Sequence, residues 1–185
     1  MRRENVAMGN ETSAPSDRSA PGPDRQAELR RAYEANLAVE RPCCAGVRMR
    51  SPGEALWVAQ TLGTPGVRDL SGADCSGLNF LEANLSGALF PEATLAQANF
   101  AQANLAGAVF FNANLRAANL TGANLRDSVL DNADLRGVTA LRADLRNASL
   151  FNADLSGANF EGATLDADTD LRNALRDGAT RLPAV

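Results

Sequence analysis

An apolar residue recurs at every fifth position of this 185-residue chain from Leu70 to Leu165, with no change of phase. Most of these residues are preceded two positions earlier by alanine and one position earlier by Asn or Asp. Such a period matches neither an α-helical turn nor the alternation of a β-strand, so it predicts a solenoid of stacked units. The repeated central residues are Leu70, Cys75, Phe80, Leu85, Phe90, Leu95, Phe100, Leu105, Phe110, Leu115, Leu120, Leu125, Leu130, Leu135, Ala140, Leu145, Leu150, Leu155, Phe160 and Leu165.

The repeat resembles that of the pentapeptide-repeat family, whose pattern A(D/N)LXX is present at Ala83-Asn84-Leu85 and recurs at 103–105, 123–125 and 143–145. This resemblance implies an all-β solenoid, a right-handed quadrilateral β-helix with four pentapeptides in each coil. The repeats would form about five coils, on the order of 24 Å tall at a strand spacing of about 4.8 Å. The resemblance implies no particular activity, because members of the family have unrelated roles.

Composition divides the remainder of the chain. The first residues are rich in Pro, Ser, Gly and charge, which predicts disorder. Apolar positions within 24–39 and 52–62 predict helices, and acids followed by Leu171, Ala174 and Leu175 predict a short helix after the last repeat. The predicted segments are a disordered tail (1–25), a helical extension or cap (26–66), the pentapeptide-repeat β-helix (67–165) and a C-terminal capping helix and tail (166–185).

The last of these segments has an alternative role. A C-terminal helix forms the dimer of the gyrase-protecting, quinolone-resistance proteins of the family, which this chain distantly resembles. The C-terminal helix could therefore cap the solenoid alone, or both cap it and form a homodimer.

Charge and targeting signals restrict the partners. The chain has 18 basic residues, all of them Arg, against 22 acidic residues and no His, which gives a net charge of -4 and no basic patch. We therefore expect no direct binding to nucleic acid. Arg2-Arg3 is not followed by an apolar segment, so we expect no export signal, no membrane span and a cytoplasmic protein. A secreted effector with a disordered export signal remains an alternative.

Catalytic chemistry has little basis in this sequence. Without His, a general base would have to be a perturbed carboxylate or thiolate, and the regularly spaced Asp residues suit turns. We predict no enzyme, no catalytic residue, no cofactor and no metal. Cys75 occupies a central position and is expected in the core, whereas Cys43-Cys44 is expected as a reduced pair in a loop, with redox activity or lipidation as alternatives.

Residues twenty positions apart fall on the same face of a four-sided solenoid, and one face departs from the polar pattern. It is expected either to be covered by the N-terminal segment, through Leu56 and Trp57, or to bind a protein partner. A local bulge at Ala140 would displace only the last of its apolar residues. The candidate protein-binding residues are Leu89, Val109, Phe111, Val129 and Phe151.

Two functions are therefore compatible with the sequence. A protein-interaction scaffold is favoured by the apolar face. A DNA-mimicking modulator of DNA gyrase is suggested by the quinolone-resistance relatives, but it would require a continuous acidic track. Asp74, Asp134 and Asp154 share a face, and Thr94 and Asn114 interrupt them.

Overall fold

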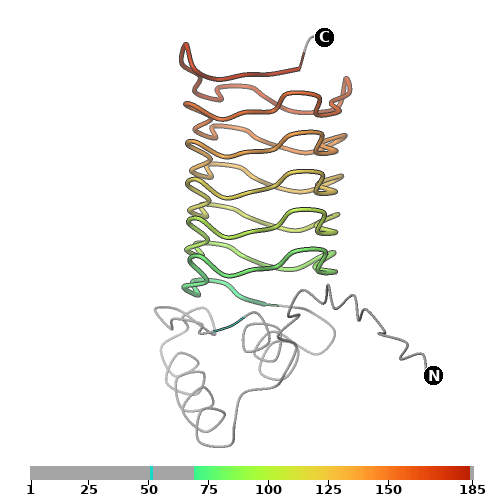
Figure 1. Cartoon of the computed structure of the whole chain (residues 1–185). Helices are drawn as coiled ribbons and strands as arrows, with labels where there is room; N and C mark the ends of the chain where they lie inside the picture. Colours follow the sequence, from blue (N-terminus) through green and yellow to red (C-terminus); the bar gives the residue numbers. More distant parts are fainter. Residues whose placement is uncertain (1–50, 52–68, 184–185) are drawn as a thin grey trace, which may run out of the picture.

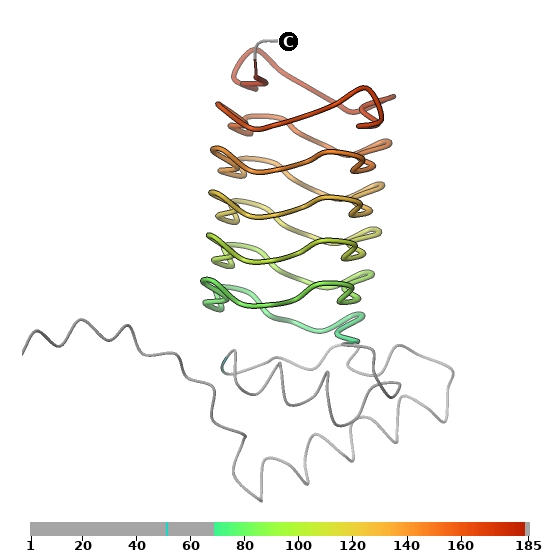
Figure 2. The ribbon, with the colours of Figure 1, turned by 90° about the vertical axis from the view of Figure 1, so that its right-hand side faces the viewer.

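The computed structural model describes Ser51 and residues 69–183. Within these residues there is no α-helix, and every β-interaction is an isolated parallel bridge rather than a longer strand. The chain winds into a tube of stacked coils with four sides (Figures 1 and 2). Apart from Ser51, the predicted tail (1–25) and the predicted helical extension (26–66), with Cys43, Cys44 and Trp57, lie outside the described residues.

The bridges define the four sides. Between Asp69 and Thr164 each bridge joins residues twenty positions apart, as four pentapeptides per coil require. The bridge residues are as follows: face 1, Asp69, Leu89, Val109, Val129, Ser149 and Asp170; face 2, Asp74, Thr94, Asn114, Asp134, Asp154 and Leu175; face 3, Asn79, Asn99, Asn119, Thr139, Asn159 and Arg181; face 4, Asn84, Asn104, Asn124, Asp144 and Thr164.

Each pentapeptide has the same local structure. A bridge residue is followed by an inward central residue, two corner residues and a small inward residue. In the first unit Ala73 N donates to Leu70 O (3.0 Å), which closes a turn, and the second corner residue, Gly72, has φ 68°. A positive φ at that position is typical of a type II turn and suits Gly or Asn. The first corner amide, Ser71 N, donates to Asp69 Oδ1 (2.9 Å), which explains the Asn and Asp at bridge positions.

The core is the column of central and small residues. The central residues from Leu70 to Phe160 are buried, and four phenylalanines pack in the N-terminal half. Phe80 stacks on Phe100 and Phe90 stacks on Phe110, both at 5.0 Å between ring centroids. Phe100 also makes edge contacts with Phe90 (6.2 Å) and Phe110 (6.4 Å). Offset and edge-on aromatic pairs stabilise a core beyond simple burial.

The phase holds at Ala140, where a bulge was an alternative. Thr139 bridges both Asn119 and Asn159 at the usual separation of twenty, and Ala140 is fully buried. The small side chain at this central position is accompanied by a larger one, Val138, at a position that is elsewhere usually alanine.

This exchange of sizes gives a test of packing. Val138→Ala should destabilise the protein by about 1–3 kcal/mol, because no larger central side chain fills the space it leaves. The double variant Val138→Ala/Ala140→Leu restores the usual pattern and should return within about 1 kcal/mol of the wild type. Urea denaturation measures both, and a double variant less stable than Val138→Ala would show that the two positions do not share one space.

The predicted C-terminal helix is wrong, because the solenoid continues to Arg181. Asp170, Leu175 and Arg181 extend faces 1, 2 and 3, with bridge separations of 21, 21 and 22 residues. Leu171 and Ala174 pack against the core, whereas Leu175 is outward and 60% exposed. The helix-like spacing of these residues was therefore coincidental. The homodimer through that helix, which was one of two alternatives, loses its structural basis within the described residues.

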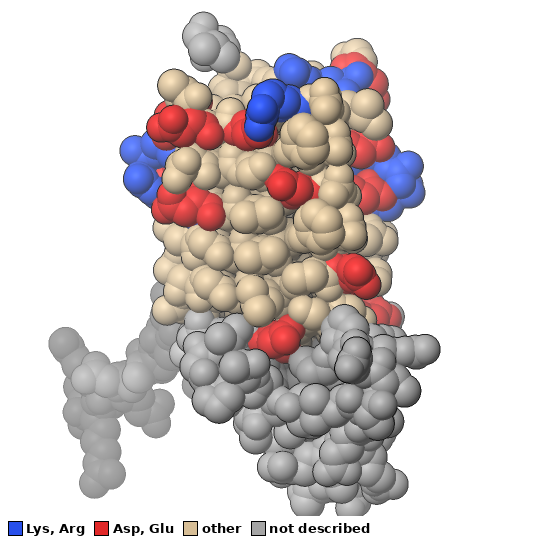
Figure 3. Space-filling model, turned by 180° about the vertical axis from the view of Figure 1, so that it is seen from behind, with Lys and Arg blue, Asp and Glu red and all other residues tan. Residues whose placement is uncertain are grey.

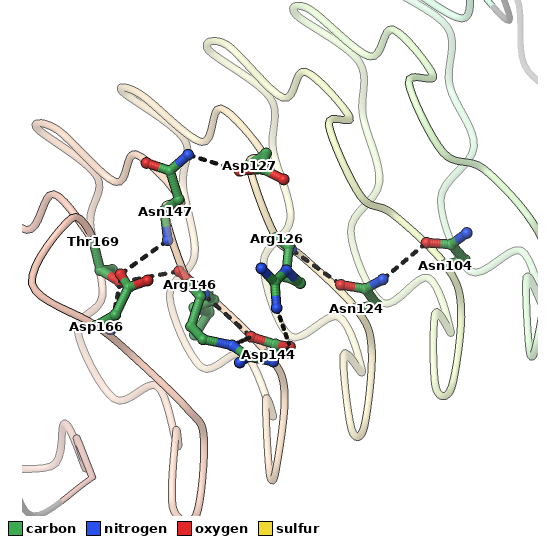
Figure 4. A network of polar contacts seen from close by, with 10 residues as sticks. Asn104, Asn124, Arg126, Asp127, Asp144, Arg146, Asn147, Asp166 and Thr169 are labelled. Carbon is green, nitrogen blue, oxygen red and sulfur yellow. Dashed lines mark hydrogen bonds and ion pairs between the residues drawn. The ribbon is translucent and has the colours of Figure 1, made fainter.

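Single-residue insertions account for the longer separations. Where the first insertion occurs, Asp166 Oδ1 accepts Asn147 N (3.0 Å), a donor that would otherwise bond a backbone carbonyl of the next coil (Figure 4). The Thr169 hydroxyl lies 2.9 Å from that Oδ1 and 3.1 Å from Leu145 O. The corner at 177–180 repeats this Asp-x-x-Thr arrangement. Side chains thus satisfy ladder groups that the widened backbone no longer reaches.

Candidate protein-binding face

Face 1 carries apolar bridge residues in the middle of the solenoid. Leu89, Val109 and Val129 follow one another in three consecutive coils and are half-buried. Phe111, the first corner residue of the middle coil, is 42% exposed. Phe151, two coils further on, is half-buried. The structure therefore places all five sequence-predicted residues on one face, and we name them the apolar strip.

The apolar strip changes the hydrogen bonding of the backbone as well as the surface. On face 1 the bridge residues two positions before Phe111, Asp131 and Phe151 are neither Asn nor Asp. Among the described residues, none of these three backbone N–H groups has a hydrogen-bond acceptor. They form a column of three donors in successive coils, about 4.8 Å apart along the solenoid. Sequence analysis missed this column, although the missing Asn or Asp at each bridge position would have identified it.

Other residues of face 1 do not supply acceptors for this column of amides. Pro91 follows Leu89 and has no N–H, so its coil lacks a donor at this position. Ser149 Oγ donates to Asp131 Oδ1, and the Phe151 amide makes no hydrogen bond to Ser149 Oγ. At the C-terminal end of the face, the Arg172 guanidinium lies 5.8 Å from the centroid of the Phe151 ring. Face 1 is therefore apolar in its middle and polar towards its C-terminal end.

Faces 3 and 4 show the usual arrangement. Asn99 Nδ2 donates to Asn79 Oδ1 (2.8 Å) and Asn119 Nδ2 donates to Asn99 Oδ1 (3.1 Å) on face 3. Face 4 has a similar ladder that includes Asn104 and Asn124 (Figure 4). These amides also accept the first corner N–H groups in most coils. On these two faces most of the first corner amides therefore have a side-chain acceptor, and the Leu141 amide on face 3 is an exception, in contrast to the run of three on face 1.

Charged pairs occupy faces 2 and 4. Arg136 Nε donates to Asp134 Oδ1 (2.8 Å) and lies 3.6 Å from Asp154 Oδ2, while Arg146 Nε donates to Asp144 Oδ1 (2.8 Å). The hydrogen bond from its Arg partner lowers the pKa of Asp134 and that of Asp144. In Figure 3 basic side chains lie beside acidic ones at both margins, and further charged side chains are scattered over the largely uncharged surface between them. Pairing breaks up the acidic character that DNA mimicry would require.

The part of the chain that the structure describes contains no group of three or more His, Cys, Asp or Glu side chains that could hold a metal. Cys75 is fully buried in the core. Among the described residues no helix has the length and apolarity needed to cross a membrane.

Comparison with known proteins agrees with this architecture. The family model for a pentapeptide repeat region matches residues 83–160. A pentapeptide repeat protein from the Arabidopsis thaliana thylakoid lumen is 34% identical over 57% of this chain and 72% of its own, with a TM-score of 0.34. The chain belongs to the pentapeptide-repeat family. This pentapeptide-repeat protein therefore has the β-helical fold expected from its repeat.

Two further solved structures resemble this pentapeptide-repeat protein. Rfr23 from the cyanobacterium Cyanothece 51142 is 24% identical and covers 83% of this chain and 99% of its own, with a TM-score of 0.45. QnrB1, a plasmid-mediated fluoroquinolone resistance protein, is 17% identical over 58% of this chain and 73% of its own, with a TM-score of 0.33. No curated protein is a significant match in sequence.

The unsatisfied amides make a stability prediction for this pentapeptide-repeat protein. Val109→Asn/Val129→Asn supplies acceptors for the Phe111 and Asp131 amides, as Asn99 does for Ala101 N (3.1 Å). A net hydrogen bond contributes about 0.5–1.5 kcal/mol, which offsets the lost contact between the two half-buried valines. We expect the variant to be as stable as the wild type or more stable in thermal denaturation. A clear fall in Tm would mean that the valines pack against something that stabilises the fold.

Proposed function

We propose that this protein is a non-enzymatic binding module that recognises a protein partner through face 1. The apolar strip carries the proposal, because the bridge residues up to Thr164 are polar on three faces, whereas Leu89, Val109 and Val129 follow one another on the fourth. The strip adds an exposed aromatic ring and three unsatisfied backbone donors. An apolar patch with directional polar groups is typical of a protein-binding surface.

The alternative within the family is action on DNA gyrase. QnrB1 is a fluoroquinolone resistance protein, and for this chain a similar role would need an acidic track along one side. Face 2 has its Asp residues interrupted by Thr94 and Asn114, and Asp134 is paired with Arg136. These observations favour the binding module over DNA mimicry.

The test compares the chain with two matched double variants. Val109→Asn/Val129→Asn removes the apolar strip. Thr94→Asn/Thr139→Asn makes the same kind of change at half-buried bridge positions on faces 2 and 3, where the Ala96 and Leu141 amides also lack acceptors among the described residues. Both variants should remain folded, since Asn is common at bridge positions.

Each tagged protein is used to capture partners from the cells that produce it, and bound proteins are quantified by mass spectrometry. We expect at least one protein that the wild type and Thr94→Asn/Thr139→Asn retain and that Val109→Asn/Val129→Asn loses. Equal capture by all three would contradict the proposal. Purified DNA gyrase is tested separately in a supercoiling assay, where we expect no effect, and inhibition or drug protection would place the protein with the gyrase modulators.

A further inference from the structure

The column of amide donors on face 1 limits what can cover the face. The Phe111, Asp131 and Phe151 N–H groups lie in three successive coils and have no acceptor among the described residues. Stacked coils repeat at about 4.8 Å, so a partner that satisfies these donors must present acceptors at nearly the same interval. The spacing of the donors therefore selects among classes of partner.

Most common binding segments do not match this interval. An extended peptide lying along the solenoid axis repeats the same side every two residues, at about 6.6–6.8 Å. An α-helix repeats about every 5.4 Å, and its backbone carbonyls are already bonded within the helix. Another stack of parallel coils has the same interval by construction. The donor column thus favours a second solenoid over a single peptide or helix.

The chain itself presents suitable groups on the same face. Asp131 has a carboxylate among the first corner residues, and the second corner residues of three successive coils are Asn112, Asn132 and Asn152, all exposed. These side chains offer acceptors at the interval of the coils. The apolar strip is also self-complementary, because it can pack against a copy of itself around a two-fold axis.

We propose that face 1 binds face 1 of a second copy of this chain, with the two solenoids antiparallel. The proposal rests on the proposed function and names the partner of the same face. In the antiparallel arrangement centred between the coils of Val109 and Val129, these two residues face each other across the interface. Asp131 then lies opposite Phe111, where its carboxylate, which also accepts Ser149 Oγ, can accept the Phe111 N–H. Pro91 lies opposite Phe151, so the acceptor that the proposal places is the one for the Phe111 amide.

The parallel arrangement is less favourable. There the first corner residues of one copy face the bridge residues of the other at the same level, which sets the Asp131 carboxylate against Val129. Burial of a carboxylate against an apolar side chain is costly. Because the strip spans only four coils, the interface is at the small end of specific interfaces, and we expect a reversible dimer with micromolar affinity.

Sedimentation velocity of the full chain from about 1 μM to about 1 mM tests the proposal. We expect the wild type and Thr94→Asn/Thr139→Asn to shift from monomer to dimer as concentration rises, and Val109→Asn/Val129→Asn to associate at least about tenfold more weakly. A wild type that stays monomeric throughout, or a face 1 variant that dimerises like the wild type, overturns it. Circular dichroism confirms that each variant is folded.

A second variant tests the orientation. Asp131→Ala keeps the apolar strip and removes the carboxylate that faces the Phe111 amide, so it should weaken the dimer about tenfold. Unchanged dimerisation by this variant overturns the antiparallel arrangement. Failure of self-association is distinguishable from failure of the proposed function: a monomeric protein whose capture of another protein depends on Val109 and Val129 would retain the function and refute the dimer.

Discussion

Replacing Phe100 by alanine should reduce the free energy of unfolding by about 3–5 kcal/mol, the largest effect that we expect from any single core substitution. Phe100 is fully buried, stacks on Phe80 and contacts the edges of Phe90 and Phe110. Truncation therefore removes three aromatic contacts and leaves a space in the middle of the column. Domains are stable by about 5–15 kcal/mol in total, so this loss is a large share.

Two control variants separate the effect of burial from the effect of the aromatic ring. Phe111→Ala deletes the same side chain at a position that is 42% exposed, and it should cost less than about 1 kcal/mol. Phe100→Leu substitutes the residue that occupies most central positions, and it should lie between the two. Urea denaturation followed by circular dichroism measures all three. A loss from Phe100→Ala no greater than that from Phe111→Ala would mean that the aromatic column does not carry the stability of these coils.

Acid should destabilise the C-terminal half of the solenoid as the pH falls from about 4 to about 2. Among the described residues, five carboxyls have a pKa below the ordinary value of 3.8, and the pKa of Asp170 is lowered to about 2 by its hydrogen bonds with Arg172. All five lie between residues 134 and 177; the others are Asp134, Asp144, Asp166 and Asp177.

Because these pKa values are lowered in the folded state, the stability of the protein should fall as the pH falls. A carboxyl whose pKa is lower in the folded state contributes stability above its unfolded pKa, and this contribution is lost as the pH falls through the folded pKa. Asp134 and Asp144 lose ion pairs with Arg, while Asp166 and Asp177 become weaker acceptors for the backbone and threonine groups of the inserted corners.

Hydrogen exchange at pH about 6 and pH about 2.5, corrected for intrinsic rates, locates the effect. Coils within 129–183 should lose protection before those within 69–128. The variant Asp134→Asn/Asp144→Asn/Asp170→Asn keeps a side-chain oxygen for the corner amides and cannot titrate, so its urea midpoint should depend less on pH. Uniform loss of protection along the solenoid, or an unchanged pH dependence in the variant, would contradict this assignment.

Much of the solenoid could be predicted from local sequence. The central apolar residues are buried in the core, and the small residues leave room for them. The Asn or Asp at a bridge position supplies an acceptor for the corner amide. Because each unit contacts only its neighbours, these local requirements repeat at a fixed interval and set the coil. The same interval correctly grouped Leu89, Val109, Phe111, Val129 and Phe151 on one face and kept the phase through Ala140.

The C-terminal end could not be predicted in this way. Leu171, Ala174 and Leu175 have the spacing of a helix face, and only the stack beneath decided otherwise. Asp170 and Leu175 bridge to Ser149 and Asp154 because a preceding coil offers open backbone groups, and a helix would leave those groups unsatisfied. The one-residue insertions obscure the period, and the Asp and Thr side chains that make them tolerable act on residues a full coil away.

The sequence by itself therefore determined the type of fold, the inward residues and the face on which the apolar side chains gather, because all three follow from a five-residue period. Only the tertiary structure decided where the solenoid ends and which backbone amides on face 1 have no acceptor. Both depend on hydrogen bonds between coils and around corners, and such bonds are set by what lies next to a residue in space rather than by its own repeat.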